Sequence, residues 1–194
     1  LSRFAENPCK EHYAGMKHLL RYLRGTTDYK LTYYSDGAAN LTGYTDASFG
    51  DCVDTRRSTS GVLFMLSGGP VCWISKMERT VVLSSTEAEY TALSRGVREL
   101  HFLINVLRDL GDRVTLPVTV FIDCQPAKFL AESYVANQRT KHFDVKLHHV
   151  RNNIKDGMVA LEYIPTEHQI ADCLTKALAK EKIKVFVKKM NLSN

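Results

Sequence analysis

Hydrophobic and polar residues follow one another along this chain with two periods, one typical of strands and one typical of helices. Spacing of three and four residues predicts a first helix at a run of apolar positions: Tyr13, Met16, Leu19, Leu20 and Leu23. Gly25 ends that pattern. A short strand is predicted at 31–34, and the turn-rich residues 35–40 mark a candidate domain boundary.

The next part of the chain has the pattern of strands joined by turns. Three strands are predicted in succession, at residues 41–49, 60–66 and 71–76. The polar run 50–57 separates the first two, and a Gly-Gly-Pro turn separates the last two. A continuation of the third strand through 81–83 is left open. This order predicts a local antiparallel meander.

From residue 86 the period becomes that of a helix. The long segment 86–110 is predicted to be helical, and Gly111 ends it. Strands are then predicted at 118–123 and 158–164, and helices at 126–133, 140–155, 168–178 and 180–190. Three antiparallel strands followed by strands reached through helical crossovers predict an α/β fold, with a mixed sheet flanked by helices.

Composition narrows the class of protein without naming a function. The 194 residues are 44% hydrophobic and 24% charged, which suits one globular domain with an appendage or two small domains. No apolar run reaches membrane-spanning length, and the first ten residues lack the pattern of a signal peptide. Five scattered cysteines without a CxxC pair argue against a zinc site and favour free thiols.

The net charge of +5 suits a polyanionic partner but does not demonstrate one. The charge is uneven, because residues 176–190 hold six lysines and one glutamate. A solvated helix face and a nucleic-acid contact explain this tail equally well.

Three aspartates stand out by their positions. Asp46 lies inside a strand of apolar and hydroxyl residues, and Asp123 ends the apolar run 118–122. Open α/β sheets place their sites near the carboxyl ends of strands, so Asp123 is a natural ligand, although an aspartate there also often caps the following helix. Asp172 stands near the start of a later predicted helix, where a first-turn acid is the alternative.

The long predicted helix carries Glu87 and Glu89 on different faces. Positions at helical spacing after Glu89 are apolar or small: Leu93, Gly96, Leu100, Leu103 and Leu107. The same offsets from Glu87 give a polar series: Thr91, Ser94, Arg98, His101 and Asn105. Glu89 therefore leads the face predicted to pack on the sheet, and Glu87 leads the solvent face. A carboxylate on a buried face needs a partner or a metal ion, which makes Glu89 the functional candidate.

Acids brought together from separate elements typically hold Mg²⁺ or Mn²⁺ through oxygen ligands. The blocks that surround these acids resemble the ribonuclease H domain of copia-type LTR retrotransposon polyproteins. They are GYTDAS at 43–48, RRSTSG at 56–61, WISK at 73–76, LSSTEAEY at 83–90, IDCQ at 122–125, RTKHFD at 139–144 and IADCLTK at 170–176. Residues 18–26 resemble the segment that joins reverse transcriptase to ribonuclease H. We therefore assign 1–40 to that connection and 41–194 to the ribonuclease H domain with a basic C-terminal helix.

The resemblance implies a ribonuclease H-like fold with a five-stranded mixed sheet. It also implies two Mg²⁺ ions, replaceable by Mn²⁺, held by the catalytic acids Asp46, Glu89, Asp123 and Asp172. Contacts to the hybrid are implied for Ser85, Thr86 and Gln125. Phosphate contacts, with a solvated surface as the equal alternative, are assigned to Arg56, Arg57, Lys76, Arg139 and Lys141.

Two further residues need separate treatment. Asp36 stands in a string similar to a retroviral active site, but it precedes the strand that carries the copia-type pattern, so we interpret it as a turn residue. His168 lies four residues before Asp172, and an auxiliary role in proton transfer or product release competes with a plain surface role.

The implied reaction is hydrolysis of the RNA strand of an RNA/DNA hybrid during reverse transcription, leaving 3′-hydroxyl and 5′-phosphate ends. The expected partners are the hybrid and the reverse transcriptase domain of the same polyprotein, without a membrane or a small-molecule cofactor, in a cytoplasmic virus-like particle. One alternative is a nucleic-acid-binding module of the same fold with weak or no catalysis. Another is a related nuclease or integrase, although the chain lacks a histidine/cysteine zinc segment.

Overall fold

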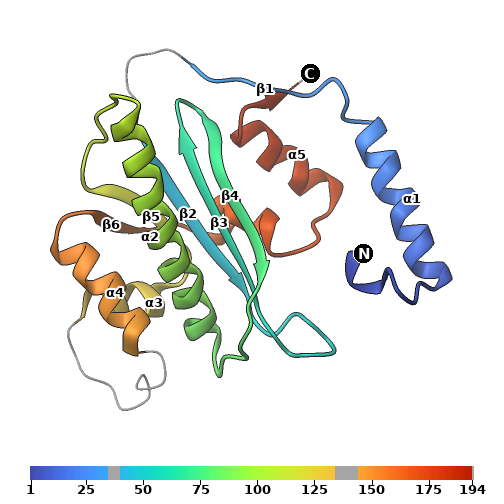
Figure 1. Ribbon diagram of the computed structural model, residues 1–194, viewed down its shortest axis with the longest axis horizontal. Coiled ribbons are helices and arrows are strands. Elements are labelled where there is room, and N and C mark those ends of the chain that lie inside the picture. The colour runs from blue at the N-terminus through green and yellow to red at the C-terminus, as the bar shows by residue number, and fades with distance from the viewer. Residues whose placement is uncertain (35–39, 134–143, 194) are drawn as a thin grey trace.

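The computed structural model describes residues 1–34, 40–133 and 144–193, and Figure 1 shows their arrangement. In chain order, the elements are η1 (Ser2–Phe4), α1 (Lys10–Arg24), β1 (Lys30–Leu31), β2 (Thr42–Ser48), β3 (Thr59–Leu66), β4 (Gly69–Met77), α2 (Ser85–Asp109), β5 (Val118–Ile122), α3 (Gln125–Glu132), α4 (Asp144–Lys155), β6 (Val159–Tyr163), η3 (Thr166–His168), η4 (Ile170–Leu174), α5 (Lys180–Lys189) and β7 (Leu192–Ser193).

The main sheet has five strands in the order β4-β3-β2-β5-β6. β2, β3 and β4 pair antiparallel, as predicted for a meander, whereas β5 pairs parallel with both β2 and β6. The predicted mixed sheet is therefore confirmed. A second, two-stranded sheet joins β1 to β7 and so links the segment after α1 to the C-terminal end of the described chain.

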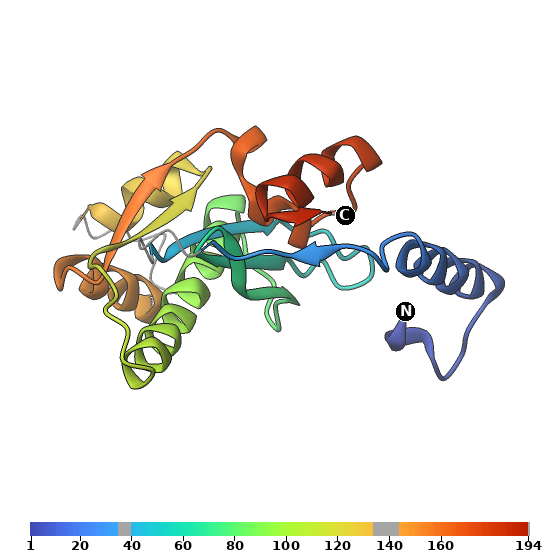
Figure 2. The same cartoon turned by 90° about the horizontal axis from the view of Figure 1, so that it is seen from above.

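Helices cover both faces of the sheet, and Figure 2 shows α2 and α5 on opposite sides of it. The alternation along β3 explains this arrangement, because neighbouring residues of a strand point to opposite faces. Phe64 belongs to the core formed with α2, while Leu63 and Met65 pack with Ile170 and Phe186 on the other side. Residues of α2 on one side, and of η4 and α5 on the other, thus pack against opposite sets of strand residues.

Two glycines allow the backbone layers to approach closely beside the acids. A Cβ atom at Gly96 of α2 would lie 2.7 Å from Cγ2 of Thr45, so α2 can cross β2 at this height only without a side chain there. A Cβ atom at Gly61 of β3 would lie 2.8 Å from the carbonyl oxygen of Ala171. The first approach places α2 directly against β2, and the second places η4 directly against β3.

The N-terminal helix α1 lies to the side of the main body (Figure 1), and none of its residues, all within the described range 1–34, is buried. The following residues do contact the body. The Tyr33 hydroxyl donates to the carbonyl oxygen of Pro70 at 2.8 Å. The backbone N–H of Tyr34 donates to the carbonyl oxygen of Ser67, also at 2.8 Å. The chain therefore attaches to the β3–β4 turn shortly after α1 ends.

Three predicted elements differ from the structure. The strand predicted at 31–34 is limited to β1, because Tyr33 and Tyr34 instead contact the β3–β4 turn. β4 ends at Met77 and does not continue through 81–83, which lie just before the start of α2 at Ser85. The helix predicted at 168–178 is two short 3₁₀ helices, η3 and η4, since the side chain of Gln169 caps the backbone of Ala171 and interrupts a continuous helix.

The helix predicted at 140–155 is described from Asp144 onward, and residues 140–143 lie outside the described residues. Throughout the three described ranges, no helix combines the length and the apolar character needed to cross a lipid bilayer.

Candidate active site

Carboxylates from three elements meet just beyond the last paired residues of β2 and β5. Asp46 lies in β2, Asp123 directly follows β5, and Glu89 lies near the start of α2. One oxygen from each of the three lies within 4.8 Å of the others. The sheet register explains the first pair, because the paired residues of β2 and β5 end at Tyr44 and Phe121. Asp46 and Asp123 each follow two residues later, so they stand at the same height of the parallel sheet.

Helix packing supplies the third carboxylate. The residues predicted to form the buried face of α2 after Glu89 are all buried: Leu93, Gly96, Leu100, Leu103 and Leu107. This face rests on the sheet, and Gly96 touches Thr45, the neighbour of Asp46. Glu89 lies on the same face two turns before Gly96, so its carboxylate reaches the end of β2.

The prediction that Glu87 faces solvent is wrong. Glu87 is buried, with 6% of its surface exposed. Its Oε2 atom accepts a hydrogen bond of 2.9 Å from the backbone N–H of Leu83, and its own N–H donates to Oγ of Ser84 at 3.1 Å. This reciprocal cap satisfies two backbone donors at the start of α2. Glu87 is thus a first-turn capping acid outside the three-acid group.

Burial and mutual repulsion make the three-acid group electrostatically costly. Burial raises the pKa of Asp46, and its hydrogen bond from Thr175 and the charge of Lys176 oppose that rise. Burial, together with the nearby charges of Asp46 and Asp123, raises the pKa of Glu89 to about 9. Since ionising Asp46 and Glu89 is unfavourable at this buried position, a bound cation would stabilise their charged forms.

Asp172 lies beside the group but is not part of it. Its carboxylate forms an ion pair with Lys176 one turn later in the chain. Thr175, between them, donates its hydroxyl hydrogen to Oδ2 of Asp46 and lies 3.2 Å from the carbonyl oxygen of Asp172. Asp172 is buried and its charge acts on Asp46, so the fourth predicted acid is next to the cluster while bound to another partner.

Comparisons with known proteins find relatives across the whole chain, although no family model matches it. A retrovirus-related Pol polyprotein from the transposon TNT 1-94 of Nicotiana tabacum is 40% identical over 185 residues, 95% of this chain. A retrovirus-related Pol polyprotein from the transposon RE1 of Arabidopsis thaliana is 33% identical over 193 residues, 100% of this chain. The chain is therefore homologous to a segment of the retrovirus-related Pol polyproteins of these transposons. It spans 14% and 13% of these two relatives.

Solved structures identify the fold of this Pol segment. LC11-RNase H1, isolated from compost by a metagenomic approach, superposes with a TM-score of 0.54 at 20% identity, covering 71% of this chain and 94% of that chain. The same protein in complex with an RNA/DNA hybrid gives a TM-score of 0.52 at 19% identity, covering 70% and 93%. The Pol segment therefore has the ribonuclease H fold, as predicted.

Three residues predicted to contact a hybrid lie next to the acids in the chain. Ser85 and Thr86 begin α2 before Glu89, and Gln125 begins α3 after Asp123. Ser85 and Gln125 are exposed. Thr86 hydrogen-bonds the side chain of Cys124, which links the start of α2 to the end of β5. These polar groups therefore lie beside the three-acid group, and their contact with a hybrid stays a prediction.

The predicted phosphate contacts are spread more widely. Arg56 and Arg57 are exposed in the connection between β2 and β3. Lys76 is exposed on β4 and pairs in register with Ser60, which pairs with Ala47 next to Asp46. Two strand spacings, about 10 Å, separate Lys76 from that height of β2. Arg139, Lys141 and the turn residue Asp36 lie outside the described residues.

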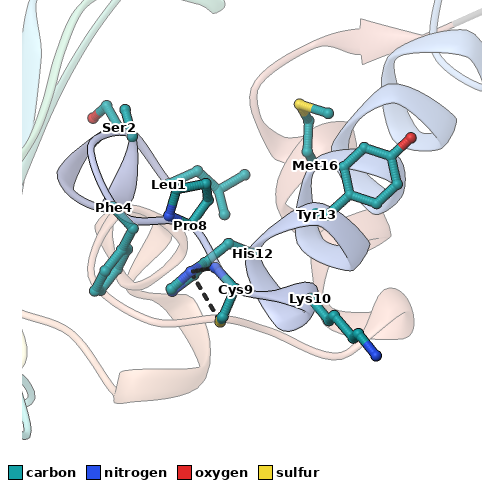
Figure 3. A pocket seen from close by; sticks show the side chains of 10 residues that line it. Leu1, Ser2, Phe4, Pro8, Cys9, Lys10, His12, Tyr13 and Met16 are labelled. Carbon is teal, nitrogen blue, oxygen red and sulfur yellow. Dashed lines mark hydrogen bonds between the residues drawn. The ribbon is translucent and has the colours of Figure 1, made fainter.

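His168 is exposed in η3, and its Nδ1 atom lies 3.4 Å from Nζ of Lys189 in α5. The three-acid group does not include it. A cavity of roughly 700 Å³ is lined only by residues between Leu1 and Met16 (Figure 3), so it also lies apart from the acids.

Sequence reasoning missed the polar residues that surround the acids from η4 and its flanks, namely Gln169, Thr175 and Lys176. Thr175 and Lys176 had a visible signal, because they follow Asp172 within the IADCLTK block. Gln169 had none beyond its position just before that block. Its partners are backbone groups of distant strands, which the sequence does not bring together.

Proposed function

We propose that this Pol segment is an endoribonuclease that hydrolyses the RNA strand of RNA/DNA hybrids with two divalent ions held by its carboxylates. The observation that carries the proposal is the convergence of Asp46, Glu89 and Asp123, with oxygens within 4.8 Å of one another. The ribonuclease H fold and the Pol relatives support it.

The donor set fits the proposed ions. Among the described residues, the cluster consists of carboxylates alone, and hard oxygen ligands favour Mg²⁺ or Mn²⁺ over zinc or copper. Burial above all, and neighbouring carboxylates after it, raise the pKa values of Asp46 and Glu89, and a bound divalent cation would favour their ionised forms. We therefore expect cation binding to release protons from this group.

Bound divalent ions would supply an activated water and stabilise the departing 3′ oxygen, leaving 3′-hydroxyl and 5′-phosphate ends. Asp46, Glu89 and Asp123 would hold the ions, with Asp46 the best placed to be shared between two. Thr175 orients the Asp46 carboxylate through its hydrogen bond. Asp172 would add a fourth ligand once Lys176 releases it, because its carboxylate is already bound in an ion pair.

Substrate recognition would come from polar groups beside the acids. Ser85, Thr86 and Gln125 offer hydroxyl and amide groups suited to sugar and phosphate contacts, while Arg56, Arg57 and Lys76 offer positive charge. Specificity for a hybrid would then depend on 2′-hydroxyl groups and helix shape rather than on base sequence. A solved neighbour of the same fold was determined with an RNA/DNA hybrid, which supports this substrate class.

The rest of the proposal concerns the wider polyprotein. We propose that residues 1–40 are the connection to a reverse transcriptase domain and that 41–194 form the ribonuclease H domain. The similarity to Pol polyproteins across 95% and 100% of the chain supports a shared context for both parts. Location in a cytoplasmic virus-like particle stays a prediction from the family. His168 stays an auxiliary candidate.

One observation favours a second candidate function, which is hybrid binding with weak or no catalysis. The ion pair of Asp172 with Lys176 occupies the carboxylate that a complete four-acid site would use. A protein that holds this pair against the second ion would bind the hybrid without cutting it efficiently.

The test is cleavage of a labelled RNA/DNA hybrid with Mg²⁺. Asp46→Asn removes the central charge, and Asp54→Asn, which changes an exposed aspartate in the β2–β3 connection, is the matched control. We expect the first variant to lose cleavage and the second to retain it. Undiminished cleavage by Asp46→Asn would overturn the assignment. Hybrid binding by the unaltered chain without Mg²⁺-dependent cutting would favour the second candidate.

A further inference from the structure

Gln169 lies at the centre of the segments that carry the acids, and its side chain is fully buried, with 0% exposed. Its Nε2 atom donates to the carbonyl oxygen of Thr45 at 3.0 Å and to that of Phe121 at 3.3 Å. Its Oε1 atom accepts from the backbone N–H of Ala171 at 3.2 Å. One amide therefore connects β2, β5 and η4.

Each of these bonds ends beside a carboxylate of the proposed site. Thr45 directly precedes Asp46, and Phe121 is two residues before Asp123. Ala171 directly precedes Asp172, although Asp172 itself is bound to Lys176. The amide thus connects the backbone positions from which the carboxylates project.

The end of the parallel ladder explains why the connection is needed. The paired residues of β2 and β5 stop at Tyr44 and Phe121, while the carboxylates lie beyond that point. Past a ladder's end, backbone carbonyls lack strand partners and the strands are free to separate. Buried carbonyls need donors, and the two N–H groups of one amide can serve one carbonyl on each strand. Gln169 continues the connection to the height of the acids.

We propose that Gln169 is a positioning residue that sets the separation of Asp46 and Asp123, and through it the affinity of the site for a divalent cation. The inference rests on the proposed function, because it assumes that these acids bind cations. Gln169 itself is not a metal ligand in this scheme, since both ends of its amide are bound to backbone groups.

The chemistry of the side chain makes the proposal specific. Both hydrogens on Nε2 and one acceptor on Oε1 are used, and among common side chains only an amide offers this set. Asparagine has the same groups on a side chain one methylene shorter. Methionine has a similar length but offers no N–H donor, so Gln169→Met removes the connection while keeping the volume similar.

The closing experiment measures binding of Mn²⁺ alone to the full 194-residue chain by calorimetry, with no nucleic acid present. We expect Gln169→Met to weaken Mn²⁺ binding about 10- to 100-fold, the range seen when partners that orient metal ligands are removed. With a hybrid substrate and Mg²⁺ we expect kcat to fall while KM for the hybrid changes little, because the proposed substrate contacts lie elsewhere.

Asn153→Leu is the matched control. Asn153 is also a largely buried amide, with 8% of its surface exposed. It connects α4 to α2, because its Oδ1 atom accepts from Nε2 of His101 at 2.5 Å, and its Nδ2 atom donates to the carbonyl oxygen of His149 within α4 at 2.8 Å. We expect this variant to lose stability while keeping the Mn²⁺ affinity of the unaltered chain. If Gln169→Met does not fold, Gln169→Asn replaces it, and we expect severalfold weaker Mn²⁺ binding.

The outcomes separate the two proposals. Absence of Mn²⁺ binding to the unaltered, folded chain would overturn the proposed function itself. Normal binding by the unaltered chain and equally tight binding by the folded Gln169 variant would overturn only the positioning role. Equal weakening in Asn153→Leu would also overturn that role, because it would reduce the effect to general loss of stability.

Discussion

Helices α1 and α2 have the same kind of sequence pattern and opposite surroundings. Both place apolar residues at three- and four-residue spacing. Twelve of the 25 residues of α2 are buried, whereas α1, which lies wholly within the described residues, has none. In α1 the apolar side chains of Leu20 and Leu23 remain 57% and 51% exposed. Figure 1 shows the cause, since α2 lies along the sheet while α1 lies outside it.

Periodicity thus determines which face of a helix is apolar, but it does not determine what covers that face. α2 packs on the sheet, where Val62 and Phe64 of β3 belong to the same core as its apolar face. No such surface faces α1 among the described residues, where it has no buried position. This fits the proposal that α1 belongs to a connection between domains, and it gives the two helices different expected responses to the same substitution.

The largest expected contrast comes from truncating one leucine in each helix. Leu100→Ala in α2 removes a side chain that is 1% exposed, so we expect a loss of about 2–5 kcal/mol in the free energy of unfolding. Leu20→Ala in α1 should change it by less than about 0.5 kcal/mol, as for other exposed sites. Urea denaturation measures both. Equal losses would show that α1 has a buried partner in solution.

The second contrast compares the two glutamates of α2. Glu89→Gln removes one charge from the three-acid group, and we expect hybrid cleavage to fall at least about 100-fold, because ion-mediated charge stabilisation is worth several kcal/mol. Glu87→Gln keeps a side-chain oxygen for the Leu83 N–H and should retain cleavage within about threefold. Steady-state rates with Mg²⁺ measure both. If Glu87→Gln loses as much as Glu89→Gln, the face assignment is wrong.

The third contrast concerns pH and the glutamates near the start of each helix. The pKa of Glu89 is raised from 4.5 to about 9, so the folded chain holds a proton that the unfolded chain has lost. The contribution of protonated Glu89 to the free energy of unfolding is fully present below pH 4.5 and is lost as the pH rises toward about 9. Without metal, stability should therefore fall across that window, by at most about 1.4 kcal/mol per pH unit.

Urea denaturation with EDTA at several pH values measures this slope. Glu89→Gln should flatten it, and Mn²⁺ should reverse the loss at high pH. The control is Glu11→Gln in α1, because the hydrogen bond with Cys9 lowers the pKa of Glu11 and its contribution changes only below pH 4.5. An unchanged slope in Glu89→Gln would contradict the assignment of the raised pKa.

The smallest contrast uses one glycine in each helix. Gly96→Ala places a Cβ atom 2.7 Å from Thr45 Cγ2, so we expect a net loss of about 1 kcal/mol or more in unfolding free energy. Gly15→Ala places one 3.3 Å from Cδ2 of Leu1, the end of a flexible side chain, and should raise stability by up to about 1 kcal/mol or leave it unchanged. Thermal and urea denaturation compare them. A stabilising Gly96→Ala would mean that α2 can shift away from β2.

Much of the fold was predictable because its strongest signals are local. The meander of β2, β3 and β4 and the face of α2 below Glu89 follow from alternation and helical spacing, and both are confirmed. Predictions failed where a side chain overrides the local pattern. Glu87 turns inward to cap α2, and the amide of Gln169 interrupts the helix predicted at 168–178. Both effects depend on a side chain that bonds backbone instead of solvent.

Local pattern was enough to choose the candidate acids, since strand position selected Asp46 and Asp123 and helical spacing selected Glu89. The folded chain was needed to show that these three meet while Asp172 is bound to Lys176. Beyond the last paired residues of β2 and β5, the amide of Gln169, distant in the chain, bonds one carbonyl of each strand, and in our proposal it sets their separation. Local periodicity carries no information about such a contact, nor about what α1 packs against.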